Sequence, residues 1–161
     1  MKKVLLFFML ALFCGTAAWA QNAQKVSESE VTPKHVKDFQ QQQKKATQVV
    51  WYKLSDDTYR VDFRDADGDN ASILFGNKGS ETYYYIPENC YPAFVRDTVE
   101  HNANFKGFSI DKLYVRKVKN NVTYQARIIK KSGFLWWKKV TAAKLVNFEV
   151  GGKFIDAIDY E

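Results

Sequence analysis

One segment near the middle of the chain alternates apolar and charged side chains, and this period of two fits a β-strand that buries one face. Tyr59, Val61 and Phe63 fall on one side of such a strand, and charged residues fall on the other. The apolar side must be covered by a second layer of structure. The sequence therefore predicts a sheet with one packed face and one open face.

Two helices are expected to form the covering layer. Thr32 and Pro33 suit the cap and the first position of a helix, and apolar residues recur at helical spacing as far as Val50. Pro87 or Pro92 begins the second helix. Further strands are expected, in chain order, at residues 73–75, 82–86, 110–118, 122–129, 143–150 and 153–158.

The second half of the chain repeats the pattern of the first. Thr58-Tyr59 begins a strand in the first half as Thr123-Tyr124 does in the second. Phe75, four residues before Gly79, likewise matches Phe148, four residues before Gly152. The expected fold class is α+β, with two tandem helix-plus-antiparallel-sheet units at residues 32–86 and 87–161. A single cystatin-like domain, with one helix on one sheet, is the alternative.

The first twenty residues have the three parts of a cleavable signal peptide. Lys2 and Lys3 are followed by an apolar run at residues 4–13, which is too short to span a bilayer. Ala18-Trp19-Ala20 then supplies the small residues that signal peptidase requires. We expect residues 1–20 to be removed and the protein to be periplasmic or secreted.

Cleavage would leave a chain with one cysteine, Cys90. An internal disulfide is then impossible, so packing must stabilise the fold. The new N-terminus, residues 21–31, is polar without periodicity and is expected to be a disordered leader. Cys14 offers a lipid anchor as an alternative, but the large Phe13 precedes it where a small residue is needed.

Short apolar and glycine motifs occur along the chain in the order of the expected helices and strands. They are Trp51, Tyr59-x-Val61-x-Phe63, Phe75-x-x-x-Gly79, Ile86-Pro87, Phe108-x-Ile110, Tyr124 and Gly151-Gly152-Lys153-Phe154-Ile155. With them, residues 36–158 resemble the PepSY-like, beta-lactamase-inhibitor-like family of exported Bacteroidetes proteins. The resemblance implies that the sheets of the two units join into one curved surface. After Gly79 the family places a tryptophan where this sequence has three tyrosines, and no inhibitory contact residue can be carried over.

Residue combinations for catalysis are not found in the sequence. Cys90 and His101 would lie about three turns apart on one helix, too far to hydrogen-bond, and His35 is remote from both. Cys90 is therefore expected to be a small core residue. We predict no enzyme activity and no cofactor.

The acidic residues 65–70 raise the question of a calcium site. An EF-hand loop needs glycine at its sixth position and glutamate at its twelfth, and these positions hold Asn70 and Gly76. A hairpin turn built on Asp67-Gly68 explains the segment better. We expect no metal site, although weak calcium binding stays open.

The segment 130–139 has the most unusual composition. Phe134, Leu135, Trp136 and Trp137 are consecutive, so a half-buried strand cannot hide them all, and lysine pairs flank them. They are candidate partner-binding residues, because tryptophan is enriched at binding hot spots. A membrane surface is a second possible target, since tryptophan and lysine both suit the headgroup region. A third interpretation folds the aromatics back over the core.

Tyr83-Tyr84-Tyr85 must point to both faces of a sheet, and Tyr84 is the further candidate for partner binding. The net charge of +6 is scattered, which disfavours nucleic acid as a partner.

The sequence thus predicts an exported non-enzymatic binding module of the cell envelope, one form of which is an enzyme inhibitor. It would bind an envelope or secreted protein through the open sheet face and the loop 130–139. The alternative is an envelope-associated structural protein held at a membrane by the loop.

Overall fold

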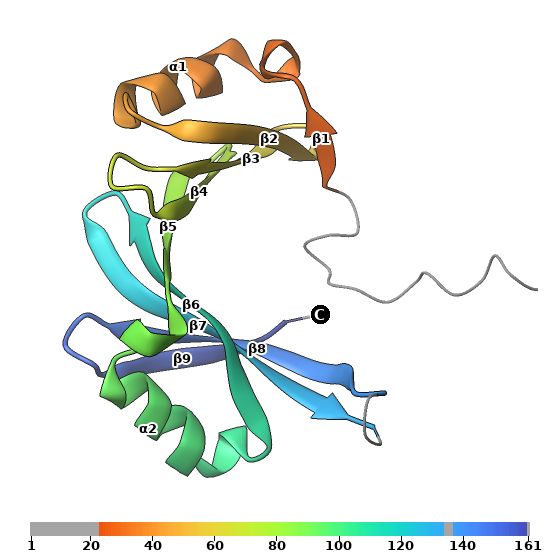
Figure 1. Ribbon diagram of the computed structural model, residues 1–161, viewed down its shortest axis with the longest axis vertical. Helices are drawn as coiled ribbons and strands as arrows, with labels where there is room; N and C mark the ends of the chain where they lie inside the picture. The colour runs from red at the N-terminus through yellow and green to blue at the C-terminus, as the bar shows by residue number, and fades with distance from the viewer. Residues whose placement is uncertain (1–22, 134–136, 161) are drawn as a thin grey trace, which may run out of the picture.

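The computed structural model describes residues 23–133 and 137–160, and all strands within them belong to one antiparallel sheet (Figure 1). The nine strands lie side by side in chain order, so each pairs with its neighbours in sequence. Their bounds are β1 (Gln24–Val26), β2 (Thr47–Ser55), β3 (Thr58–Arg64), β4 (Asn70–Gly76), β5 (Gly79–Ile86), β6 (Phe108–Val118), β7 (Asn121–Ser132), β8 (Lys139–Glu149) and β9 (Phe154–Asp159).

Helical structure in the described residues is limited. The α-helices are α1 (Pro33–Gln42) and α2 (Ala93–His101), and the 3₁₀ helices are η1 (Glu28–Glu30), η2 (Glu88–Cys90) and η3 (Ala103–Phe105). Strands hold 55% of the described residues and helices 21%.

The expected α+β class, with two tandem helix-plus-sheet units, is therefore wrong. The protein is a mostly-β fold with a single nine-stranded sheet. The reason lies at the join between the halves, where β5 and β6 pair continuously from Glu81↔Val118 to Ile86↔Leu113. This ladder merges the strands of both halves into one hydrogen-bonded sheet.

The first helix begins at Pro33 as predicted but ends at Gln42, well before Val50. The residues from Thr47 to Ser55 form β2 instead. This run holds two adjacent valines followed by Trp51 and Tyr52, and β-branched and aromatic side chains favour a pleated sheet. Pairing also decides the outcome, because Trp51 lies opposite Val61 of β3 and is buried.

The segment expected to be a disordered leader has ordered structure in its described part. Val26 of β1 pairs with Trp51, and Val31 is buried in the core. Between them the Glu30 carboxylate accepts hydrogen bonds from the backbone N–H and hydroxyl of Ser27 at 2.8 and 2.7 Å. Two apolar anchors and a capping box thus hold a segment whose polar composition suggested disorder.

Cross-strand register places both helices on the same face of the sheet. One row of paired residues runs through Ala71, Tyr84, Val115, Tyr124 and Phe148, from β4 to β8. Ala71 belongs to the hydrophobic cluster beneath α1, and Phe148 belongs to the cluster beneath α2. Because directly paired residues point to the same side, no helix of the described residues covers the opposite face.

The two helices lie at opposite ends of the long axis with the strands between them (Figure 1). The sheet therefore curves, and the face without helices lies on the inside of the curve.

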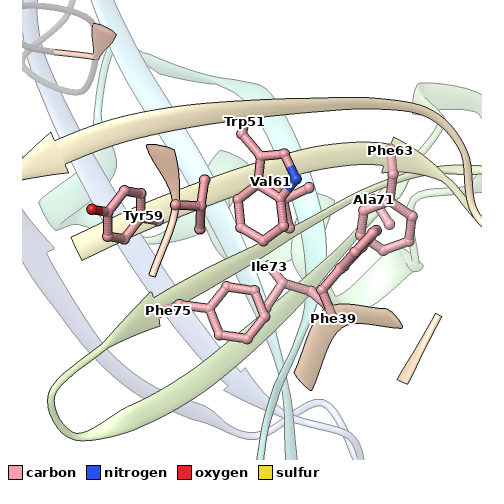
Figure 2. Packing of buried hydrophobic residues seen from close by; sticks show 9 residues of the cluster. Phe39, Trp51, Tyr59, Val61, Phe63, Ala71, Ile73 and Phe75 are labelled. Carbon is pink, nitrogen blue, oxygen red and sulfur yellow. The ribbon is translucent and has the colours of Figure 1, made fainter. Parts of the chain in front are cut away.

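The cluster beneath α1 is aromatic. Phe39 of α1 meets Trp51 and Phe63 edge to face, with ring centroids 5.5 and 5.2 Å apart (Figure 2). Val61 and Ile73 are fully buried beside them. The alternating pattern of β3 predicted this arrangement correctly, since Tyr59, Val61 and Phe63 are its buried residues.

Replacing Phe63 by aspartate should unfold the protein or lower its melting temperature strongly. The change removes a buried ring, which alone costs about 3–5 kcal/mol, and places a carboxylate where it has no partner. Thermal melting followed by circular dichroism measures the effect. Arg64→Asp, on the exposed neighbouring position, is the matched control and should melt close to the wild type. Equal melting temperatures for the two variants would contradict the assignment of the faces.

Candidate functional site

The face of the sheet opposite the helices carries a set of polar and aromatic side chains from strands β3 to β7. We call it the open face, and its centre is formed by Arg60, Ser72, Tyr83, Tyr114 and Arg127. The register aligns them, because Ser72 pairs with Tyr83 and Tyr83 pairs with Arg116 on the same side. They alternate along their strands with the buried residues of the core.

Two adjoining hollows lie on the open face, one of about 580 Å³ and one of about 180 Å³. The residues common to both are Arg60, Ser72, Tyr83, Lys112 and Tyr114. The larger hollow extends toward Arg64 and Tyr85, and the smaller toward Arg127 and Tyr160. A single depression with a shared floor thus crosses the join between the two halves of the sheet.

Tyr83 is fixed by charged neighbours at this join. Its hydroxyl donates a hydrogen bond to Glu81 at 2.6 Å, and Arg116 donates to the same carboxylate oxygen from Nε at 3.0 Å. Arg116 Nη2 lies 2.9 Å from this oxygen. Burial raises the pKa of Tyr83 to about 12, and the hydrogen bond and negative charge of Glu81 add to the increase.

Tyr114 stands between two other tyrosines of the open face. The centroid of its ring lies 6.1 Å from that of Tyr83 and 6.1 Å from that of Tyr85, in both cases edge to face. Burial raises the pKa of Tyr114 as well. These contacts hold the three rings in one orientation.

Two arginines extend the set on either side. The guanidinium of Arg60 lies 4.6 Å from the ring centre of Tyr52, and its Nε is 3.1 Å from Asp62. Arg127 lies 5.4 Å from the ring centre of Tyr160. Its Nη1 is 3.3 Å from Asp111. Each arginine is thus placed between an aromatic ring and a carboxylate, an arrangement that stiffens a long side chain.

Two other cations on this face are more accessible. Arg64 and Lys112 are exposed and line the larger hollow. Within residues 23–133 and 137–160, neither takes part in an ion pair. They give the hollow a positive charge that the neighbouring carboxylates do not balance.

The tyrosine predicted for partner binding lies on the other side of the sheet. Tyr84 pairs with Ala71 and packs against the cluster beneath α1, so its ring belongs to the helix-covered face. Tyr83 and Tyr85 are the two that reach the open face. Partner binding by Tyr84 stays a prediction, and the geometry favours its neighbours for that role.

The loop between β7 and β8 contains the other predicted site residues. Trp137 is 75% exposed. Phe134, Leu135 and Trp136 lie outside the described residues. The flanking lysines Lys131 and Lys138 are exposed. Contact with a partner or a membrane through this loop stays a prediction.

Cys90 is exposed, so the expectation of a core position is wrong. It ends η2, and α2 begins only at Ala93 after a second proline. Cys90 and His101 therefore do not share a helix.

In the acidic segment, Asp65 Oδ1 accepts hydrogen bonds from the backbone N–H groups of Asp67 and Asp69, both at 3.0 Å. These bonds form the polar turn predicted there.

Sequence reasoning missed most of the open face. Tyr52, Tyr114 and Arg127 were not singled out, although the alternation of β3 already placed Arg60 on the exposed side. The usable signal was a period of two in β6, where Lys112, Tyr114 and Arg116 occupy every second position.

The fold belongs to a recognisable structural class, which is BLIP-like. In a comparison with solved structures, the chain matches the crystal structure of a BLIP-like protein from Bacteroides fragilis, with a TM-score of 0.57. The two sequences are 15% identical, over 81% of this chain and 89% of the other. No family model matches the sequence, and no curated protein does. The comparison supports the beta-lactamase-inhibitor-like part of the resemblance, and it does so for the fold alone. The PepSY-like assignment and export stay predictions.

In the described residues, no helix has the length and apolar character needed to cross a membrane.

The raised pKa of Tyr83 makes stability depend on pH in the alkaline range. The folded state holds the phenolic proton more tightly than the unfolded chain, whose ordinary pKa is 10.0. This contribution is complete below pH 10 and is lost as the pH rises through about 12. Tyr83→Phe should therefore lose less stability than the wild type over this range. Melting temperatures of both proteins at neutral pH and across the alkaline range test it, and parallel curves would contradict the assignment.

Proposed function

We propose that this chain is an exported, non-enzymatic binding module of the cell envelope that holds a partner protein on its open face. The observation that carries the proposal is the connected set of tyrosines and arginines at the centre of that face. Tyrosine and arginine are the residues that, with tryptophan, dominate binding hot spots. The BLIP-like fold is consistent with a binding module and gives indirect support to a non-catalytic role.

The contacts on the open face make these side chains suitable for binding. Tyr83 is held by Glu81, Tyr114 by two neighbouring rings, and Arg60 by Tyr52 and Asp62. A side chain that is already ordered loses less conformational entropy when a partner binds. A partner surface placed here would meet rigid rings rather than flexible ones, which favours specific recognition.

Charge indicates what the partner should present. Arg64 and Lys112 are exposed at the larger hollow and are not neutralised by ion pairs in the described part of the chain. A carboxylate on the partner would complement them and would speed association. The partner we expect is therefore a protein with an acidic segment at the contact.

Two finer parts of the proposal depend on other observations. Residues 1–20 have the pattern of a signal peptide, which supports export to the periplasm or the medium. Inhibition of an enzyme is one form that binding could take, and the likeness to a BLIP-like protein supports it as the first form to test. Fold alone does not carry function, so the assay must start from binding.

The double variant Tyr85→Ala, Lys112→Ala should lose the partner. Both side chains are exposed on the open face, so their removal should leave the core intact. The chain lacking residues 1–20 is immobilised and used to capture proteins from envelope extract of the source organism. The captured protein is then titrated against each variant. We expect a loss of affinity of about tenfold or more.

Two controls accompany this experiment. Lys34→Ala, on the exposed side of α1, removes a positive charge from the helix-covered side and should bind like the wild type. Trp137→Ala removes an exposed aromatic away from the open face. Loss of binding only in Trp137→Ala would move the contact to the β7–β8 loop and contradict the proposal.

A second candidate function is attachment to a membrane surface through the β7–β8 loop. The observation that favours it is Trp137, which is 75% exposed and is followed by exposed Lys138 and Lys139. An indole beside ammonium groups suits the headgroup region of an anionic bilayer. The protein would then be an envelope-associated structural protein.

Vesicle flotation tests this second candidate. The wild type should float with vesicles of mixed phosphatidylcholine and phosphatidylglycerol, and Trp137→Ala should stay in the dense fraction. The Tyr85→Ala, Lys112→Ala variant is the control and should float. If the wild type stays in the dense fraction, the membrane function is excluded, whatever the outcome of the capture experiment.

A further inference from the structure

The last strand of the sheet is an edge with an unusual amount of exposed apolar surface. Within residues 23–133 and 137–160, β9 pairs with β8 and with no other strand, and all six of its residues are exposed. Phe154, Ile155 and Ile158 are 40%, 45% and 53% exposed. An edge strand presents unpaired backbone N–H and C=O groups, which makes it a template for another strand.

The register identifies which backbone groups of β9 point toward β8 and which point away from it. The backbone N–H of Tyr160 donates to the carbonyl of Ala143 at 2.9 Å, which marks a hydrogen-bonded pair at the end of the β8–β9 ladder. In an antiparallel ladder such pairs alternate, so Ile158 and Asp156 also direct their backbone groups toward β8. Ala157 and Asp159 must direct theirs away from the sheet.

The opposite edge is much less available. β1 has three residues and is one of the short edge strands that proteins use to limit pairing. β9 is twice as long, and it contains neither proline nor lysine, the residues that usually block an edge. Its two carboxylates are already engaged, because Asp156 accepts a hydrogen bond from Asn147 at 2.7 Å and Asp159 pairs with Lys144.

We propose that β9 pairs in antiparallel fashion with β9 of a second copy of this chain, forming a two-fold dimer with one continuous sheet. This surface is the outer edge of the sheet and not the centre of the open face, so the inference goes beyond the proposed function. Pairing centred on Ala157 brings the free backbone groups of both copies together. It is isologous, as a two-fold interface must be.

The side chains of β9 also favour a second copy of the chain as the partner strand in the register centred on Ala157. With Ala157 opposite its counterpart, Asp156 lies opposite Ile158 of the second copy, and Ile155 lies opposite Asp159. No aspartate lies opposite another aspartate, and the apolar side chains of each β9 lie beside side chains of the other β9. A register shifted by one residue on each strand would place Asp156 opposite Asp156, which like-charge repulsion disfavours.

The experiment measures the mass of the chain lacking residues 1–20 by sedimentation equilibrium over a range of concentrations. The wild type should show a monomer–dimer equilibrium. Ile158→Asp places a carboxylate opposite Asp156 of the second copy and should abolish the dimer. Ile158→Lys places an ammonium at the same point and should keep or strengthen the dimer, since opposite charges attract across a strand pair. The two variants differ only in the sign of one charge.

Val140→Asp is the matched control. Val140 lies on β8 and is 49% exposed, close to the value for Ile158, so the variant has the same charge change on a comparable apolar residue. It should dimerise like the wild type. Circular dichroism confirms that each variant is folded. A wild type that stays monomeric at every concentration would overturn the inference, as would equal loss of dimer in Ile158→Asp and Val140→Asp.

Discussion

The pairing of β5 with β6 is the interaction on which the rest of the structure depends. It continues the ladder of the first five strands into the last four, with Tyr84 opposite Val115. Because side chains alternate between faces, this register decides on which face every later core residue lies. A shift by one residue would place the cluster beneath α2 on the opposite face from the cluster beneath α1. In the observed register α1 and α2 cover one face of the sheet, and no helix within the described part of the chain covers the other.

The same register gathers the polar residues of the open face at the join. Tyr83 of β5 pairs with Arg116 of β6, and Glu81 is hydrogen-bonded to both side chains. A partly buried ion pair contributes little net stability because desolvation opposes it. Its effect here is geometric, since it fixes the orientation of Tyr83 and so of the rings packed on it. The floor of the depression is thus ordered by the contacts that join the two halves.

The sequence predicted individual strands better than it predicted their assembly. The alternation around Val61 gave the correct buried face, because a period of two is a local property of a half-buried strand. The fold class was wrong because β1 and the start of β2 lie in segments expected to be a disordered leader and a helix, so that strands outweigh helices in the nine-stranded sheet. The first helix was predicted to extend over β2 because the spacing of the apolar residues there fits the period of a helix as well as that of a strand. For the candidate site, Tyr84 was chosen from three consecutive tyrosines, because the sequence does not show the strand pairing that decides which face each of them occupies. Arg127 was missed because its neighbours on the open face come from other strands.

The open face and the β9 edge show why exposure alone does not define a binding surface. On the open face, Tyr114 packs against the rings of Tyr83 and Tyr85, and the guanidinium of Arg60 pairs with Asp62. Such a surface is stable in water and changes little when a partner arrives. On β9 exposed apolar side chains lie beside backbone N–H and C=O groups that point away from β8. The first arrangement suits recognition of a different molecule by its chemistry. The second suits extension of the sheet by backbone pairing, where specificity depends on the register of the two strands.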